Sequence, residues 1–170
     1  MALEIERKFL LANDSWRKAV IRSDHFRDGL IARFGGGKVR VRRAANTAWL
    51  TVKGPRLDIS RSEFEYEIPV ADADEILSTL CDGPVVEKVC HIVPYAGFVW
   101  AVDVHVGPLA GVAFAEVELR HPDEHLRLPC WAGREVTYDP RFRKRALLRR
   151  LVAATKRKSA ATVTTAAEPS

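Results

Sequence analysis

Apolar and charged residues alternate with a period of two along much of this chain. In the first such segment, Glu4, Glu6 and Lys8 project from one face of an extended backbone, and the apolar residues between them project from the other. The pattern recurs in later segments that are separated by turn residues such as Gly35-Gly36-Gly37 and Gly54-Pro55. It predicts strands at residues 2–11, 24–34, 38–45, 47–53, 61–69, 85–93, 98–106 and 112–120.

Helical signals occur between and after these strands. Ile76, Leu77 and Leu80 are spaced as on one face of an amphipathic helix, and Asn13-Asp14-Ser15 is a helix start signal. These patterns, with a further apolar stripe near the C-terminus, predict helices at residues 14–20, 72–80 and 140–154. The stretch 122–135 shows no regular period and is predicted to be irregular.

The polar face of the predicted strands is unusual because nearly every position on it is Glu, Asp, Arg or Lys. A sheet of eight strands in hairpin order tends to curl, and closure into a barrel removes its free edges. We therefore predict an α+β fold, with a closed eight-stranded antiparallel β-barrel that forms a tunnel with a charged lumen, and a few flanking helices. The apolar faces of the strands then lie on the outer wall.

The chain of 170 residues has the length and composition of one globular domain. We place this domain at residues 1–155 and predict a disordered tail at 156–170. No apolar run approaches the roughly 20 residues of a membrane span, and charges begin at Glu4, so the predicted location is the cytoplasm. The three cysteines are isolated and show no zinc-binding spacing. The residues after position 133 carry a net charge of +7, and the rest carries −2. This basic segment has few aromatic residues for stacking on bases, so nucleic-acid binding is not predicted.

The charged face contains two chemically distinct sets. Carboxylates form an all-oxygen set that suits Mg²⁺ or Mn²⁺ rather than zinc, and Lys and Arg form a cationic set that suits phosphate oxygens. Together they predict a phosphoryl-transfer site. The alternative is that these groups only form salt bridges with one another across the lumen. The acids are Glu4, Glu6, Asp103, Glu116 and Glu118, and the cations are Lys8, Arg40, Arg42, Lys53, Arg61 and Lys88.

The ordered series of these motifs resembles the CYTH superfamily, the triphosphate tunnel metalloenzymes, over about residues 2–150. The resemblance rests on its ExExK signature at Glu4-Ile5-Glu6-Arg7-Lys8 and on the motifs that follow at matching spacing. These are Val39-Arg40-Val41-Arg42, Leu50-Thr51-Val52-Lys53-Gly54, the segment from Ser60 to Ile68, Glu87-Lys88, Val102-Asp103-Val104, the segment from Ala115 to Leu119, and Glu135-Val136-Thr137.

The resemblance implies a tunnel that binds a triphosphate-containing small molecule with a divalent metal. It places the five acids at metal-binding positions and the six cations at phosphate-binding positions, with Lys8 and Lys88 as catalytic residues. It also implies that the helix at 140–154 closes one tunnel mouth. Three residues depart from the family pattern: Cys90 replaces a common phosphate-binding cation, Leu30 replaces an aromatic residue, and Lys144 replaces a common Asn.

The expected activity is metal-dependent hydrolysis of a triphosphate, foremost inorganic tripolyphosphate. The alternatives are thiamine triphosphate or nucleoside triphosphate hydrolysis, an adenylate cyclase of the same tunnel type, and a non-catalytic polyphosphate or nucleotide binder. The sequence leaves the substrate, the metal and the choice between monomer and homodimer open.

Overall fold

The computed structural model describes residues 3–143 and 146–149 of the chain. The chain divides into two compact units, Met1–Tyr138 and Asp139–Ser170, and each is described by itself. In the second unit, Pro140–Phe142 forms a 3₁₀ turn (η3) and residues 146–149 are helical. The prediction that a helix begins at residue 140 was wrong, because Pro140–Phe142 forms this 3₁₀ turn. Residues 144–145 and 150–154 of the predicted helix, the predicted domain end at residue 155 and the predicted tail lie outside the described residues.

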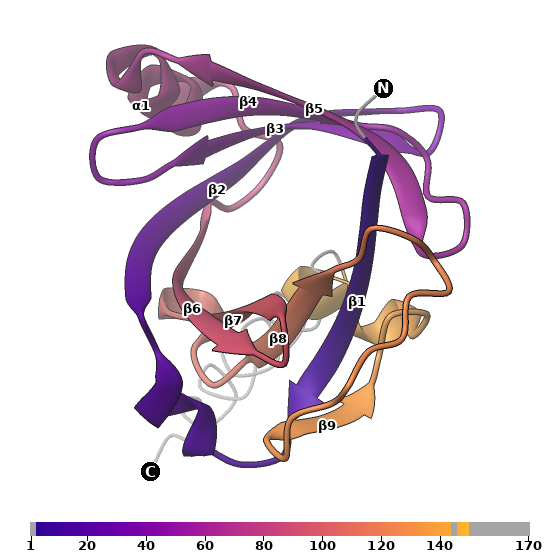
Figure 1. Ribbon diagram of the computed structural model, residues 1–170. Coiled ribbons are helices and arrows are strands. Elements are labelled where there is room, and N and C mark those ends of the chain that lie inside the picture. Colours follow the sequence, from indigo (N-terminus) through magenta and orange to yellow (C-terminus); the bar gives the residue numbers. More distant parts are fainter. Residues whose placement is uncertain (1–2, 144–145, 150–170) are drawn as a thin grey trace, which may run out of the picture. The chain divides into compact units, whose positions relative to one another are not determined.

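The first unit is an antiparallel sheet whose strands close into a ring (Figure 1). Eight strands follow the order β1-β5-β4-β3-β2-β6-β7-β8, and β8 returns to β1. The ring closes where Leu3, Glu4 and Ile5 pair with Ser62, Arg61 and Ser60. The ring strands are β1 (Leu3–Leu11), β2 (Arg22–Phe34), β3 (Gly37–Arg43), β4 (Ala48–Lys53), β5 (Ser60–Ile68), β6 (Val86–Tyr95), β7 (Phe98–His105) and β8 (Ala113–Glu118).

These eight strands confirm the strands predicted from the alternating pattern, with ends that differ by a few residues. A ninth strand, β9 (Ala132–Glu135), was missed, because residues 122–135 were expected to be irregular. It pairs with the C-terminal half of β1, where Phe9 is opposite Glu135 and Leu11 is opposite Ala132. The short helix predicted at 14–20 is present as a 3₁₀ helix, η1 (Ser15–Ala19).

One hydrophobic core lies on the outer side of β1, β6, β7 and β8. Trp100 and Val102 of β7 are buried there, and the ring centroids of Trp100 and Phe9 lie 5.5 Å apart. Trp16 of η1 and Trp131, which precedes β9, belong to the same cluster. Residues outside the ring therefore cover the apolar outer face of these strands.

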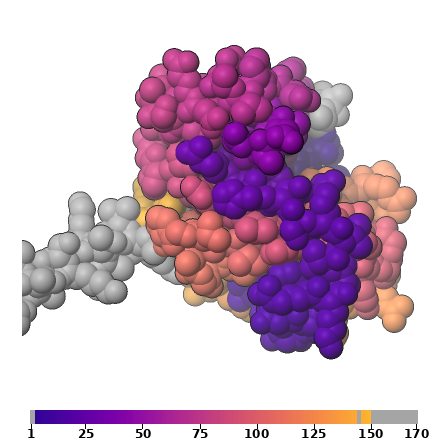
Figure 2. Space-filling view, turned by 90° about the vertical axis from the view of Figure 1, so that its left-hand side faces the viewer, coloured from indigo at the N-terminus to yellow at the C-terminus, as the bar shows by residue number. Residues whose placement is uncertain are grey.

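A second core lies where α1 (Val70–Thr79) packs on the outer side of β2, β3 and β4. Ala73 and Leu77, one helical turn apart, are buried against Val41 and Ala48. Gly29 permits the close approach, because a Cβ atom there would lie 2.9 Å from Leu77 Cδ2. Figure 2 shows this side of the molecule, with indigo residues of β2 below the magenta region that contains α1. Both cores confirm that the apolar faces lie outside the ring.

A third short 3₁₀ helix, η2 (Gly107–Leu109), connects β7 to β8. Among the described residues, no helix has the length and apolar character that crossing a membrane requires.

Candidate active site

The inner side of the ring holds a cavity of about 660 Å³ that is lined by charged side chains of both signs. Eight of the eleven predicted site residues line it: Glu4, Glu6, Arg42, Lys53, Lys88, Asp103, Glu116 and Glu118. Lys8, Arg40 and Arg61 do not line it, but each forms a salt bridge with a carboxylate. The structure therefore brings the predicted acids and cations of the alternating faces together in one place.

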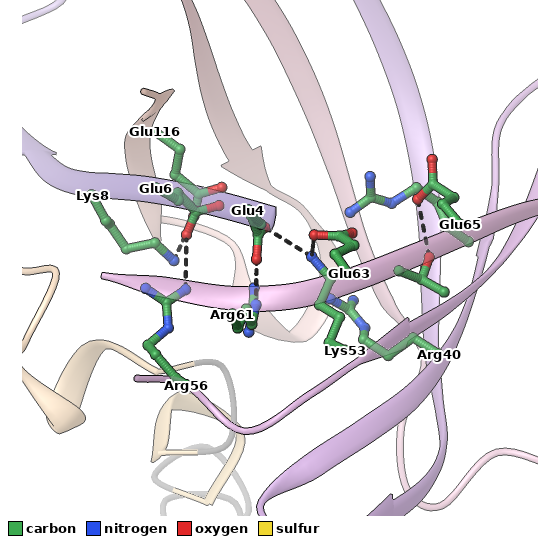
Figure 3. Close-up of polar contacts among 12 residues, drawn as sticks. Glu4, Glu6, Lys8, Arg40, Lys53, Arg56, Arg61, Glu63, Glu65 and Glu116 are labelled. Atoms are coloured by element: carbon green, nitrogen blue, oxygen red, sulfur yellow. Dashed lines mark hydrogen bonds and ion pairs between the residues drawn. The ribbon is translucent and has the colours of Figure 1, made fainter. Parts of the chain in front are cut away.

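Glu6 lies between two other carboxylates at the β1 side of this cavity. Figure 3 shows Glu4 and Glu116 beside it, together with the ammonium group of Lys8. Burial raises the pKa of Glu6 to about 7, and the charges of Glu116 and Glu4 act in the same direction. Neighbouring cations compensate the charge of Glu6 only in part. Arg56 Nη2 is 3.5 Å from Glu6 Oε1, which is a long ion pair, and Lys8 Nζ pairs with Glu116 Oε1 at 2.5 Å. Negative charge is thus crowded at this point.

Glu4 is in the opposite situation because two cations hold it. Lys53 Nζ lies 2.9 Å from Glu4 Oε1, and the guanidinium of Arg61 donates to the other carboxylate oxygen (Figure 3). Burial alone would raise the pKa of Glu4, but hydrogen bonding from Arg61 and the charge of Lys53 lower it to about 2. Lys53 also reaches Glu63 Oε2 at 2.8 Å. Glu4 is therefore an ionised carboxylate at any pH near neutrality.

Lys88, Cys90 and Asp103 form a third group on β6 and β7. Lys88 forms a salt bridge with Asp103 Oδ2, and the charge of Asp103 raises the pKa of Lys88 although burial lowers it. The other oxygen, Asp103 Oδ1, is buried and has no hydrogen-bond partner among the residues that the structure describes. Cys90 lies directly opposite Asp103 in the β6–β7 ladder, and burial raises the pKa of its thiol to about 12. Cys90 is therefore a neutral group in the cavity wall.

The two arginines of β3 share one buried carboxylate, Asp28 of β2. Arg40 Nη2 lies 2.7 Å and Arg42 Nε lies 3.3 Å from Asp28 Oδ1. The charge of Asp28 raises the pKa of Arg42 above its ordinary value, against the effect of burial. Both arginines are thus charged, and each keeps N–H groups that Asp28 does not use.

Sequence reasoning did not assign Asp28, Arg56 or Glu63 to the site. Asp28 lies at an even position of β2, two and four residues after the cavity-lining Phe26 and Asp24, so the period of two contained a signal for its face. Glu63 follows the same rule on β5. Arg56 lies in the segment between β4 and β5, where no period indicates which way a side chain points.

The carboxylate oxygens of the cavity are the kind of ligand that a hard divalent cation prefers, but their present arrangement does not form a metal site. Within residues 3–143 and 146–149, no three His, Cys, Asp or Glu side chains are placed to hold a metal ion together. Yet Glu4, Glu6 and Glu116 crowd negative charge into one place, and the buried Asp103 Oδ1 has no hydrogen-bond partner in the part of the chain that the structure describes. A bound cation would relieve both features, and the oxygen-only donors match Mg²⁺ or Mn²⁺.

Comparison with known proteins identifies the family to which this ring of strands belongs. The CYTH domain model matches residues 2–142. The chain belongs to the CYTH family. An inorganic triphosphatase of Acetivibrio thermocellus is 44% identical over 144 residues, which cover 84% of this chain and 90% of the relative. An inorganic triphosphatase of Nitrosomonas europaea is 31% identical over 148 residues, which cover 85% of this chain and 95% of the relative.

Solved CYTH-like structures agree with the ring of strands. The crystal structure of an inorganic triphosphatase matches with a TM-score of 0.61 and 28% identity, over 85% of this chain and 96% of the other. A Hippeastrum protein, described as a putative adenylyl cyclase with a dominant triphosphatase activity, matches with a TM-score of 0.55 and 14% identity, over 72% of this chain and 81% of the other. The second likeness concerns the fold alone. The prediction of a CYTH tunnel fold is confirmed.

Proposed function

We propose that this CYTH protein is a metal-dependent inorganic triphosphatase, which hydrolyses tripolyphosphate to pyrophosphate and orthophosphate. The observation that carries the proposal is the cavity itself, where Lys and Arg side chains face carboxylates that crowd one another. The relative from Acetivibrio thermocellus, at 44% identity over most of both chains, supports the same activity. A cavity of about 660 Å³ is large enough for a triphosphate with its metal.

In this proposal the carboxylates hold Mg²⁺ or Mn²⁺, and the bound ion supplies charge neutralisation and a coordinated water of lowered pKa. The residues that hold it are Glu4, Glu6, Asp103, Glu116 and Glu118. Glu118 lies opposite Glu6 in the β1–β8 ladder and is exposed, so it is the solvent-accessible member of this set of carboxylates. Glu6 must lose its proton to take part, because its pKa is raised to about 7.

The cations bind the phosphate chain and stabilise the charge that develops on its oxygens. Arginine forks match phosphate oxygens in pairs, and lysines act as point charges. Lys8 and Lys88 are the proposed catalytic residues, and each forms a salt bridge with a proposed metal-binding carboxylate. They would neutralise the transferring and leaving oxygens as the P–O bond breaks and water adds to the phosphorus. The remaining phosphate-binding residues are Arg40, Arg42, Lys53 and Arg61.

The proposal is tested by phosphate release from tripolyphosphate, ATP and thiamine triphosphate, each with Mg²⁺ and with Mn²⁺. We expect orthophosphate from tripolyphosphate with either metal, none in EDTA, and a loss of about a hundredfold or more in kcat for Glu116→Gln. Cyclic AMP from ATP would indicate a cyclase instead, and tripolyphosphate binding without turnover would indicate a binder. The cytoplasmic location and the choice between monomer and homodimer stay predictions.

A further inference from the structure

Asp28 contacts two guanidiniums at once from within the wall of the ring. Its side chain is 1% exposed, and one oxygen, Oδ1, receives both the contact from Arg40 at 2.7 Å and that from Arg42 at 3.3 Å. Asp28 and Arg42 are directly opposite in the β2–β3 ladder, and Arg40 lies two residues from Arg42 on the same face of β3. One carboxylate on β2 therefore fixes the spacing of two cations on β3.

Phe26, two residues before Asp28 on the same face of β2, contacts the same group of cations. The guanidinium carbon of Arg42 lies 5.3 Å from the centre of the Phe26 ring, and Lys88 Nζ lies 5.9 Å from it. Both distances are within the range of cation–π attraction. Phe26 also lines the cavity. β2 thus supplies an anion and an aromatic ring that together hold Arg40, Arg42 and Lys88.

We propose that Asp28, assisted by Phe26, is a positioning residue for triphosphate binding, an inference that rests on the proposed function. Asp28 holds the guanidiniums of Arg40 and Arg42 side by side, so that the N–H groups it leaves unused meet phosphate oxygens in a fixed arrangement. A guanidinium has five N–H donors, so contact with Asp28 leaves most of them available. The two long side chains are then ordered before the ligand arrives, which lowers the entropic cost of binding.

The carboxylate also has an opposing effect, because its charge cancels part of the positive charge of the two arginines. If that effect dominated, removing the charge would strengthen the attraction for an anionic ligand. Positioning and charge cancellation therefore predict opposite changes in affinity. The proposal commits to positioning, because Asp28 Oδ1 bonds both arginines directly and is almost fully enclosed.

Asp28→Asn in the full chain separates the two effects. We expect KM for tripolyphosphate to rise about tenfold, with kcat changed by less than about threefold, because the contacts of Arg40 and Arg42 with a charged carboxylate become weaker contacts with a neutral amide while the catalytic lysines remain. Calorimetric titration with tripolyphosphate in EDTA, where metal-dependent turnover cannot interfere, should show a weaker Kd by a similar factor. Asp28→Glu should restore part of the loss. An unchanged or lower KM and Kd in Asp28→Asn would overturn the proposal.

Asp74→Asn is the matched control. Asp74 of α1 also contacts two arginines, Arg27 at 3.4 Å and Arg43 at 3.3 Å, but it is 43% exposed and does not line the cavity. Its KM should equal that of the wild type. Phe26→Leu keeps an apolar side chain without the aromatic face, and its KM should rise about threefold.

Two further outcomes are decisive. If Asp28→Asn does not fold, as judged by its thermal unfolding curve, Phe26→Leu carries the test, and an unchanged KM and Kd in that variant would overturn the proposal. If the wild type releases no phosphate, the proposed activity fails, and the Kd values in EDTA alone decide whether Asp28 positions the arginines.

Discussion

Lys8 Nζ lies 2.5 Å from Glu116 Oε1, so a proposed phosphate-binding cation is paired with a proposed metal-binding carboxylate. Lys88 with Asp103 and Lys53 with Glu4 repeat this relationship elsewhere in the cavity. The ion pairs that the sequence left open as an alternative are therefore present. They are compatible with the proposed function, because a metal ion can replace the lysine as the partner of each carboxylate, and a phosphate oxygen can replace the carboxylate as the partner of each lysine.

This exchange predicts that tripolyphosphate and Mg²⁺ bind cooperatively. When Mg²⁺ occupies the carboxylates, Lys8 and Lys88 lose their partners and attract phosphate more strongly. We expect the Kd of tripolyphosphate for Glu116→Gln, measured by calorimetry in EDTA, to be lower than that of the wild type by about fivefold to tenfold, because Lys8 is released without any metal. In the wild type, Mg²⁺ should lower the Kd by at least that factor. Equal Kd values for the two proteins in EDTA would contradict the exchange.

The strands and the direction of their faces could be predicted because a period of two fixes which residues share a face. This is why Glu4 and Glu6, which line the cavity, were assigned correctly to the inside of the ring. β9 was missed because Ala132–Glu135 is short and lacks apolar alternation, and it exists through its pairing with β1. The sequence of residues 132–135 by itself contains no information about a strand as distant in the chain as β1.

The pairing of particular acids with particular cations could not be predicted, because it depends on register and curvature. Asp28 meets Arg40 and Arg42 only through the β2–β3 register, which shifts between Leu30 and Ala32. Cys90 was expected in the tunnel wall, and it does line the cavity. Leu30 is not among the cavity-lining residues, and Lys144 lies outside the described part of the chain.

The raised pKa of Glu6 predicts how the stability of the metal-free protein depends on pH. Glu6 titrates at about 7 in the folded state and near 4.5 when unfolded, so the unfolded state loses its proton first as the pH rises. The contribution of Glu6 to stability therefore falls between about pH 4.5 and 7 and is constant above that range. Glu6→Gln should be more stable than the wild type at pH 8 by about 3 kcal/mol, and nearly equal to it at pH 4.5.

Urea unfolding in EDTA at several pH values measures this difference. Glu75→Gln, which changes an exposed carboxylate on α1, is the control, and its difference from the wild type should not vary with pH. A Glu6→Gln difference that is the same at every pH would show that Glu6 does not titrate in this window.

Cys90 predicts a substitution that strengthens binding. Its neutral thiol lines the cavity beside Lys88 and opposite Asp103, whose Oδ1 has no hydrogen-bond partner among the described residues. Cys90→Arg adds a cation to this wall, and the Kd of tripolyphosphate should fall about fivefold. Cys90→Met adds length without charge and should not lower the Kd. Weaker binding by Cys90→Arg, or equal effects of the two variants, would contradict this account of the position.

The packing of α1 on the outside of the ring predicts that stability and activity can be changed separately. Leu77 is 4% exposed and lies in the core between α1 and β3, on the opposite side of the sheet from the cavity. Leu77→Ala should lower the free energy of unfolding by about 2–4 kcal/mol, because it removes buried methyl groups and leaves a void. Leu80→Ala, at a position that is 60% exposed, should change it by less than about 0.5 kcal/mol. Urea unfolding gives both values, and KM for tripolyphosphate at 25 °C should equal that of the wild type in each variant. A rise of KM in Leu77→Ala beyond that in Leu80→Ala would show that α1 shapes the cavity through β3, and that the outer core and the binding wall are coupled.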